Sequence, residues 1–520
     1  MRSWLRKDEK SSEKILGKRP LSCELEGDHD VPMTGSLSAN LRTVKRYMDE
    51  ESGITIRNIK LLDGQQKASI IYLCGLVDKE MVQEHIIRPI LAEYRSAKSL
   101  LSAPVKIDVI KESVITALKT TESKKINECL LEIYRGNTVL MLDENNKALV
   151  METPGWKTRN QEEPISEPSI RGPRDSFVET LQDGILAIRR RIKDANLVVD
   201  KHKIGRRSKT DVAIIYIKGV ANQGIVDEVL RRLSRIDIDA ILSVGHIESF
   251  IEDNTLSVFP QMQYTERPDR TAAAILEGRI AILVDTTPFA IILPSTFGMF
   301  FQAPDDYYDR WIYSTFIRAI RYLAIIISLF LPALYVSLIS FHHGLVPTKL
   351  LIFAASTREG IPFPALVEAL AMEVTIEILR EAGVRLPKSI GQAVGIVGGL
   401  VIGEAAANAG IVSPVMVIIV ALTAVASFSI PQYALGISMR ILRFLIMLFS
   451  GMFGFFGLML AYIMITAHMS KLKSFGVEYM SPLAPFSLKG MKDFILRAPI
   501  PTMKNRPEVL KPSDYKKAKE

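Results

Sequence analysis

The sequence contains few of the residues and motifs from which common enzyme sites are built. Its three cysteines, Cys23, Cys74 and Cys129, have no metal-binding spacing, and its seven histidines form no HExxH motif. It also lacks the glycine-rich signatures of dinucleotide sites and phosphate loops, and the GxSxG elbow of serine hydrolases. So few cysteines are typical of a domain without disulfides in a reducing compartment. We therefore expect no metal site, no cofactor and no enzymatic activity.

Charged residues are missing from long stretches of the second half of the chain. The chain as a whole is 48% hydrophobic and 23% charged, with a net charge of +8. Asp, Glu, Lys and Arg are nevertheless absent over 322–348 and 444–470, and only Glu404 interrupts 389–439. Apolar runs of 18 or more residues indicate membrane-spanning helices. The sequence thus predicts a soluble half followed by an all-α multipass membrane domain of about four to five transmembrane helices.

The soluble half contains an internal repeat. Ser69–Val77 recurs as Ala213–Ala221 at an offset of 144 residues, and Arg135–Asp143 recurs as Glu277–Asp285 at an offset of 142. In each copy an apolar strand ends at a glycine and is followed by a helical pattern, which favours α/β layers. The sequence therefore predicts a duplicated α/β module.

The remaining segments follow from composition. No secretory signal precedes the module, so we expect it on the cytoplasmic side. The expected organisation is a disordered tail (1–36), a first α/β repeat (41–153), a linker (154–169), a second α/β repeat (170–296), a connector (297–319), a transmembrane domain (320–470) and a basic cytoplasmic tail (471–520).

Two features of the soluble half could carry chemistry. Asp143 and Asp285 follow equivalent strands and could form a carboxylate pair, but Asp at this place is more typical of a turn. The basic stretch 189–209 could bind phosphate groups of lipids or nucleic acids. Because no aromatic residues interleave with its charges, we expect no nucleic-acid binding, and a solvated surface is the simpler interpretation.

The first part of the membrane half has an acidic helix face. Glu373, Glu377 and Glu381 are spaced by four residues and so share one face of a helix. We expect that face to meet water or protein and not lipid. Further along, small residues recur at every fourth position and predict a ridge on which a second helix packs closely: Gly391, Gly395, Gly399, Gly403 and Ala407.

A polar pair lies beside this ridge. Glu404 and Asn408 are four residues apart at membrane depth, where a carboxyl group is costly and is expected to face protein or water. One hypothesis makes them part of a polar conduit or gate. The alternative is a protonated Glu404 that hydrogen-bonds Asn408 and only holds helices together.

The number of crossings stays open. Apolar spans are expected near 320–341, 389–412, 415–435 and 441–468, and the alternative count adds a fifth near 350–380. Positive residues before the first span and after the last favour cytoplasmic ends. Four crossings satisfy that rule but leave Arg440 and Arg443 on the outer side.

Several stretches resemble one known family. They are TERPDRTAAAILEGRIAILVDTTPFAIILP (265–294), DDYYDR (305–310), LPALYV (331–336) and, most specifically, the segment 379–431. Over about 41–500 the chain resembles the A subunit of spore germination receptors of the GerA type. The resemblance implies a multipass protein of the spore inner membrane that works with a transporter-like B subunit and a lipoprotein C subunit.

The same resemblance implies a function. Family members are thought to form homo-oligomeric rings in the membrane and to release ions when nutrients bind the receptor. A paralogous member associated with the dipicolinic acid channel machinery is the nearest alternative. A secondary transporter is disfavoured because the internal repeat is confined to the soluble half.

Overall fold

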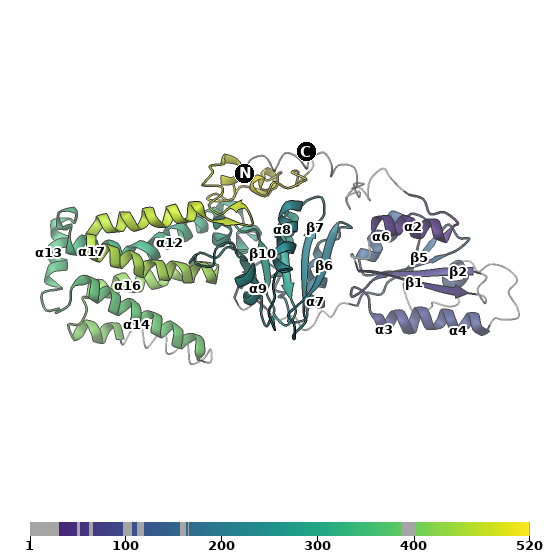
Figure 1. Cartoon of the computed structure of the whole chain (residues 1–520), viewed down its shortest axis with the longest axis horizontal. Helices are drawn as coiled ribbons and strands as arrows, with labels where there is room; N and C mark the ends of the chain where they lie inside the picture. Colours follow the sequence, from purple (N-terminus) through teal and green to yellow (C-terminus); the bar gives the residue numbers. More distant parts are fainter. Residues whose placement is uncertain are drawn as a thin grey trace.

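The computed structural model describes residues 31–48, 53–61, 66–96, 107–111, 119–155, 163–164, 166–386 and 402–518. Most of the tail expected over 1–36 lies outside these residues, as do Gly391, Gly395 and Gly399 of the expected ridge. Within them the chain forms two α/β units and a bundle of long helices (Figure 1).

The first unit is a five-stranded antiparallel sheet between two layers of helices. The strand order is β1-β2-β4-β5-β3. Successive side chains of the central strands point to opposite faces of the sheet. Ile71 therefore packs with α2 and α6, while Ile70 packs with the helical segment after β2. The elements are α2 (Leu37–Tyr47), β1 (Ile54–Leu61), β2 (Gln66–Leu73), α3 (Lys79–Val82), α4 (Arg88–Ser96), α5 (Ile107–Val109), β3 (Thr120–Ser123), α6 (Ile126–Tyr134), β4 (Thr138–Leu142) and β5 (Ala148–Met151).

The second unit repeats this architecture. Its strand order, β6-β7-β9-β10-β8, is the same as in the first unit, and its helices again cover both faces. The predicted α/β duplication is thus visible in the topology, although every strand pair is antiparallel. The elements are α7 (Leu181–Arg191), β6 (Leu197–Ile204), β7 (Thr210–Ile217), α8 (Gln223–Leu233), α9 (Val244–Ile251), β8 (Gln263–Thr265), α10 (Pro268–Leu276), β9 (Ile280–Val284) and β10 (Ala290–Leu293).

Asp143 and Asp285 have the same structural role in the two units. The Asp143 carboxylate accepts a hydrogen bond from the first backbone N–H of α2, at Leu37 (2.9 Å), and Asp285 does the same for α7 at Leu181 (3.0 Å). Each aspartate therefore caps the start of a helix more than 100 residues earlier in the chain. The two side chains sit in separate units, so the hypothesis of a carboxylate pair is wrong and the structural interpretation holds.

The helical half contains α12 (Trp311–Ser340), α13 (Thr348–Ser356), α14 (Ala365–Arg385), α16 (Pro414–Ser427) and α17 (Tyr433–Lys471). Two of these, α12 and α17, are long and apolar enough to cross a membrane. The side chains that α12, α14, α16 and α17 bury against one another form one continuous apolar core.

Helix α17 is a hairpin of two helices. Gly454 has φ 61° and ψ −140°, outside the helical region. Ser438 and His468 contact neighbouring residues of the same loop, Val258 and Ser257. A continuous helix would separate positions 438 and 468 by roughly 45 Å, so the chain must reverse between them. The expected single span over 441–468 is therefore wrong, because glycine reverses the chain inside an uninterrupted apolar run.

The directions of the other helices follow from contacts at the two ends of the bundle. The end near the α/β units is called the module end, and the end near Gly454 the distal end. At the distal end Gly454 approaches Phe341, just after α12, and Gly451 approaches Leu366, at the start of α14. Arg380, near the end of α14, bonds Ser427, the last residue of α16. Helices α14 and α16 thus both run from the distal end towards the module end.

The C-terminal segment folds back on the second α/β unit. It contains β11 (Lys473–Ser474), β12 (Val477–Glu478) and α18 (Leu488–Met491), and Leu510 is buried against α8 and α9. The Asn222 amide donates to the carbonyl oxygens of Leu510 and Lys511. The segment expected to be a basic tail is thus held on the same side of the bundle as the α/β units.

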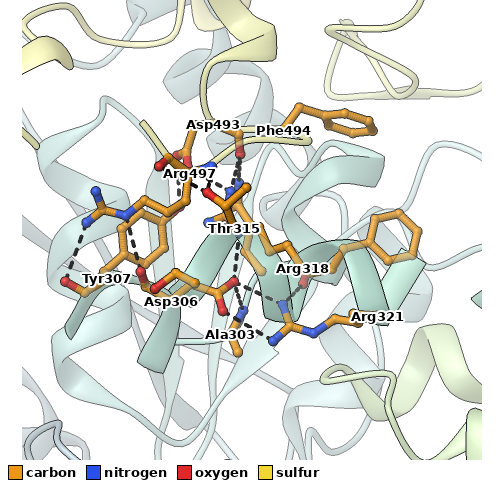
Figure 2. Close-up of polar contacts among 12 residues, drawn as sticks. Ala303, Asp306, Tyr307, Thr315, Arg318, Arg321, Asp493, Phe494 and Arg497 are labelled. Carbon is orange, nitrogen blue, oxygen red and sulfur yellow. Dashed lines mark hydrogen bonds and ion pairs between the residues drawn. The ribbon is translucent and has the colours of Figure 1, made fainter. Parts of the chain in front are cut away.

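A group of polar side chains joins α12 to the connector and to the C-terminal segment (Figure 2). Asp306, in the short helix α11 (Asp305–Tyr308), accepts hydrogen bonds from Arg318 and Arg321 at 2.9 Å each. Arg318 also bonds the Asp493 carboxylate (3.0 Å), which in turn accepts a hydrogen bond from Tyr307. Burial and the neighbouring carboxylate of Asp493 raise the pKa of Tyr307. These bonds join the connector, α12 and the C-terminal segment.

Candidate functional site

The best candidate site is a group of charged residues between α14 and α17. Glu373 and Arg443 are both wholly buried, with 1% of each side chain exposed, and their Oε2 and Nη2 atoms lie 3.2 Å apart. Sequence periodicity puts Glu373 on the inner face of α14, and Arg443 lies in the first helix of the α17 hairpin, where the apolar core surrounds it. A buried ion pair costs much desolvation free energy, so it is weak evidence for stability and worth examining for function.

Glu377 extends the pair towards the surface of the helices. Its Oε2 lies 2.7 Å from Nη1 of Arg440, and its Oε1 lies 2.9 Å from Nη1 of Arg380 and 3.3 Å from Nη2 of Arg443. Two carboxylates thus face three guanidinium groups. We call these five residues the acid–arginine cluster: Glu373, Glu377, Arg380, Arg440 and Arg443.

Several polar atoms of the cluster lack hydrogen bonds. Within the described part of the chain, both oxygens of Glu373 are unpaired in this sense, as are Nε and Nη1 of Arg443 and Nε of Arg380. A cavity of about 360 Å³ adjoins the cluster, lined by Glu377, Arg380, Glu381 and Arg440 together with apolar residues and Tyr433. Buried polar atoms normally find a partner, and a roomy polar cavity can hold water that supplies it. The cluster can therefore hold water or a small ion between the helices.

The three glutamates of the predicted acidic face have different surroundings in the structure. Glu373 and Glu377 join the cluster, whereas Glu381 is largely exposed, pairs with Arg385 of its own helix and lines the cavity beside the cluster. Glu368, one turn before the face, is buried and accepts hydrogen bonds from the backbone N–H and hydroxyl of Ser413. It therefore fixes the start of α16, which Ser413 caps.

The predicted polar pair and ridge lie on the segment just before α16. Glu404 and Asn408 are both exposed on the single chain. Gly403 is buried, and a Cβ atom there would lie 3.3 Å from Val417 of α16, while Ala407 is partly buried. The structure does not bring Glu404 or Asn408 into the acid–arginine cluster.

Several side chains of the basic stretch in the second unit pair with carboxylates. Arg206 pairs with Asp237, Lys203 with Asp211 and Arg207 with Asp239. These pairs favour the simple interpretation of a solvated charged surface over a phosphate site. Among the residues that the structure describes, no group of three or more His, Cys, Asp or Glu side chains could hold a metal ion.

Sequence reasoning does not find the arginine half of the cluster. With four crossings it leaves Arg440 and Arg443 on the outer side, because the pattern gives no sign of the hairpin at Gly454. The sequence feature that could have indicated the cluster is the presence of two arginines at the start of a long apolar helix. It also misses Glu167, in the expected linker, which is buried and accepts hydrogen bonds from Arg270 (2.6 Å) and from Gln432 (2.5 Å), just before α17.

Comparisons with known proteins agree on one family. Residues 42–509 match the family described as Bacillus/Clostridium GerA spore germination protein. The chain is 46% identical to "Spore germination protein KA" of Bacillus subtilis (strain 168), over 94% of this chain and 89% of that protein. It is 45% identical to "Uncharacterized membrane protein YfkQ" of the same organism, over 93% of each chain.

One solved structure is also similar. It is the N-terminal domain of the A subunit of the Bacillus megaterium spore germinant receptor GerK3, 34% identical, covering 52% of this chain and 99% of that one with a TM-score of 0.42. The sequence matches extend over nearly the whole chain, well beyond this domain. The chain therefore belongs to the GerA spore germination protein family.

Proposed function

We propose that the chain is the A-type subunit of a nutrient germinant receptor, that it forms a ring of identical subunits in the spore inner membrane, and that it releases ions when the receptor is triggered. The observation that carries the ion pathway is the acid–arginine cluster. Its five charges and its cavity lie between helices that pack mainly through apolar side chains. Ionisable groups at such positions are expensive and are typical of ion and substrate pathways.

We infer six crossings, one more than the upper sequence estimate. Helix α12 leads from the module end to the distal end, and α14 returns. The span predicted over 389–412 supplies a further crossing, since the helical residues 402–408 lead to Gly410, which lies near Gly360 at the distal end. Helix α16 returns, and the two helices of α17 go out and back. With six crossings both ends of the chain lie on the inner side, which satisfies the positive-inside rule. Arg440 and Arg443 then lie within a helix and no longer in an outer loop.

Exposure of Glu404 supports assembly into a ring. A carboxylate and an amide that face outward from a single chain at membrane depth need a partner other than lipid. In a symmetric ring the same pair from each subunit would line a common axis, and rings of carboxylates favour cations. The transporter-like B subunit and the lipoprotein C subunit are the partners that family membership suggests, and no enzymatic activity is part of this proposal.

Efflux of potassium from triggered spores tests the proposal. Glu404→Gln should leave the protein level unchanged and alter the rate of efflux, and Glu404→Lys should reduce the rate further because it reverses the local potential. Lys349→Gln, in the distal segment outside the cluster and the polar pair, is the matched control. Wild-type efflux in both Glu404 variants, at equal protein level, would refute a conduit lined by this residue.

A further inference from the structure

Large apolar side chains are exposed on one part of the second α/β unit. They belong to the end of α9 and to the residues that follow it. The exposed fractions are 50% for Phe250, 93% for Leu256 and 39% for Val258. A soluble domain seldom leaves so many large apolar side chains uncovered within one short segment.

This segment is attached directly to the membrane helices. The hydroxyl of Ser257 lies 2.9 Å from Nε2 of His468, and the hydroxyl of Ser438 donates to the carbonyl oxygen of Val258 at 2.6 Å. Phe259 is buried in the core of the bundle, and its ring stacks on that of His468. Ser438 and His468 both lie at the module end of the α17 hairpin. Leu256 is therefore held where the helices leave the bundle.

The surroundings of this level are those of a membrane interface. Ile437 and Ile441 of α17 are 37% and 53% exposed, so the outer face of the hairpin is apolar from its first turns. Trp311 and Tyr313 begin α12 at the same end of the bundle, with 47% and 56% exposed. Exposed Trp and Tyr are enriched at the boundary between water and lipid. The apolar surface of α17 and that of the 250–258 segment thus meet at one level.

We propose that Phe250, Leu256 and Val258 form a lipid-binding surface that enters the cytoplasmic leaflet beside α17. Side chains of this kind bind at the boundary between headgroups and acyl chains through buried apolar area. The second α/β unit then rests on the bilayer as well as on the helix ends. Contact with lipid follows from the attachment to α17, because the bilayer surrounds any face of the hairpin that protein does not cover.

Fluorescence quenching in lipid nanodiscs tests the proposal. The full chain carrying Leu256→Trp is reconstituted in phosphatidylcholine, with or without lipid brominated near the glycerol end of the acyl chains. The signal of the wild-type chain is subtracted because native tryptophans, including Trp311, also fluoresce. Arg57→Trp is the control, on an exposed position of β1 at the opposite end of the molecule from α17 (Figure 1).

We expect brominated lipid to reduce the added Leu256→Trp signal at least twofold and to leave that of Arg57→Trp unchanged. Phe250→Trp provides a second reporter in case the first variant elutes as an aggregate. An added signal at both positions that brominated lipid does not reduce would overturn the proposal and would point to coverage by protein, from a second copy or another subunit.

Discussion

Glu373 of α14 and Arg443 of α17 face each other inside the helical bundle, each with only 1% of its side chain exposed. Neither residue is satisfied by this contact alone, since both oxygens of Glu373 and two nitrogens of Arg443 have no hydrogen bond within the described residues. Glu377 and Arg440 continue the line of charge to a cavity. Mutations in this group can therefore separate an effect on stability from an effect on the proposed ion pathway.

Removal of one partner should be strongly destabilising. Arg443→Met leaves the carboxylate of Glu373 buried without a cation, which typically costs about 3–5 kcal/mol, so we expect a clearly lower melting temperature in detergent. Replacing both partners, as in Glu373→Leu with Arg443→Met, should restore most of the loss. Arg385→Met is the control, because Arg385 pairs with Glu381 at the surface. An Arg443→Met protein as stable as the wild type would show that the pair is not desolvated.

Gly454 should be intolerant of any side chain. A Cβ atom there would lie 2.8 Å from Cβ of Phe341, and φ 61° with ψ −140° is a conformation that few residues other than glycine adopt. We expect Gly454→Ala to lose about 2 kcal/mol or more of stability, measured as the melting temperature in detergent. Gly436→Ala, in the same helix with open space around it, should match the wild type. Equal melting temperatures for the two variants would contradict a hairpin at Gly454.

The two aspartate caps should be equivalent. Asp143→Ala and Asp285→Ala each remove one acceptor from the first N–H of a helix, which typically costs about 1 kcal/mol. Hydrogen exchange should show faster opening of α2 in the first variant and of α7 in the second. Exchange that changes in the wrong helix, or in neither, would contradict the assignment of the caps.

Glu248 should make the second unit sensitive to pH. Burial and the neighbouring Glu252 raise the pKa of Glu248 to about 7. A carboxyl whose pKa is raised on folding binds its proton more tightly in the folded state, so stability falls as pH rises from about 4.5 to 7 and stays low above that. At pH 8 Glu248→Gln should therefore melt at a higher temperature than the wild type, because its free energy of unfolding is larger by on the order of 2 kcal/mol. At pH 4 the two proteins should melt at the same temperature. An equal difference at both pH values would exclude ionisation as the cause.

Much of the α/β architecture can be predicted from the sequence because local signals encode it. The strands containing Ile70 and Ile214 are continuous apolar runs ended by glycine, and the constant offset between the two copies is enough to indicate the duplication. Antiparallel pairing cannot be predicted in this way, because a buried central strand has the same pattern in either direction.

The candidate site is only half predictable. The spacing of Glu373 and Glu377 gives the acidic face of α14, since periodicity is a local property. The arginines of α17 lie far along the chain, since Arg440 follows Glu377 at a sequence separation of 63, and their placement depends on a chain reversal at Gly454. The apolar run through that glycine carries no polar signal for a turn. Likewise, the burial of Glu167 depends on contacts with Arg270 and Gln432, which are remote in sequence.

The most direct test of the ion pathway compares a glutamate of the cluster with a glutamate outside it. Glu377→Gln removes a charge that contacts Arg380, Arg440 and Arg443, whereas Glu359→Gln removes an exposed charge from the segment that precedes α14. Potassium efflux from triggered spores should change several-fold in the Glu377 variant and remain at the wild-type rate in the Glu359 variant, with equal amounts of protein in the membrane. Identical wild-type efflux in both variants would contradict an ion pathway through the acid–arginine cluster.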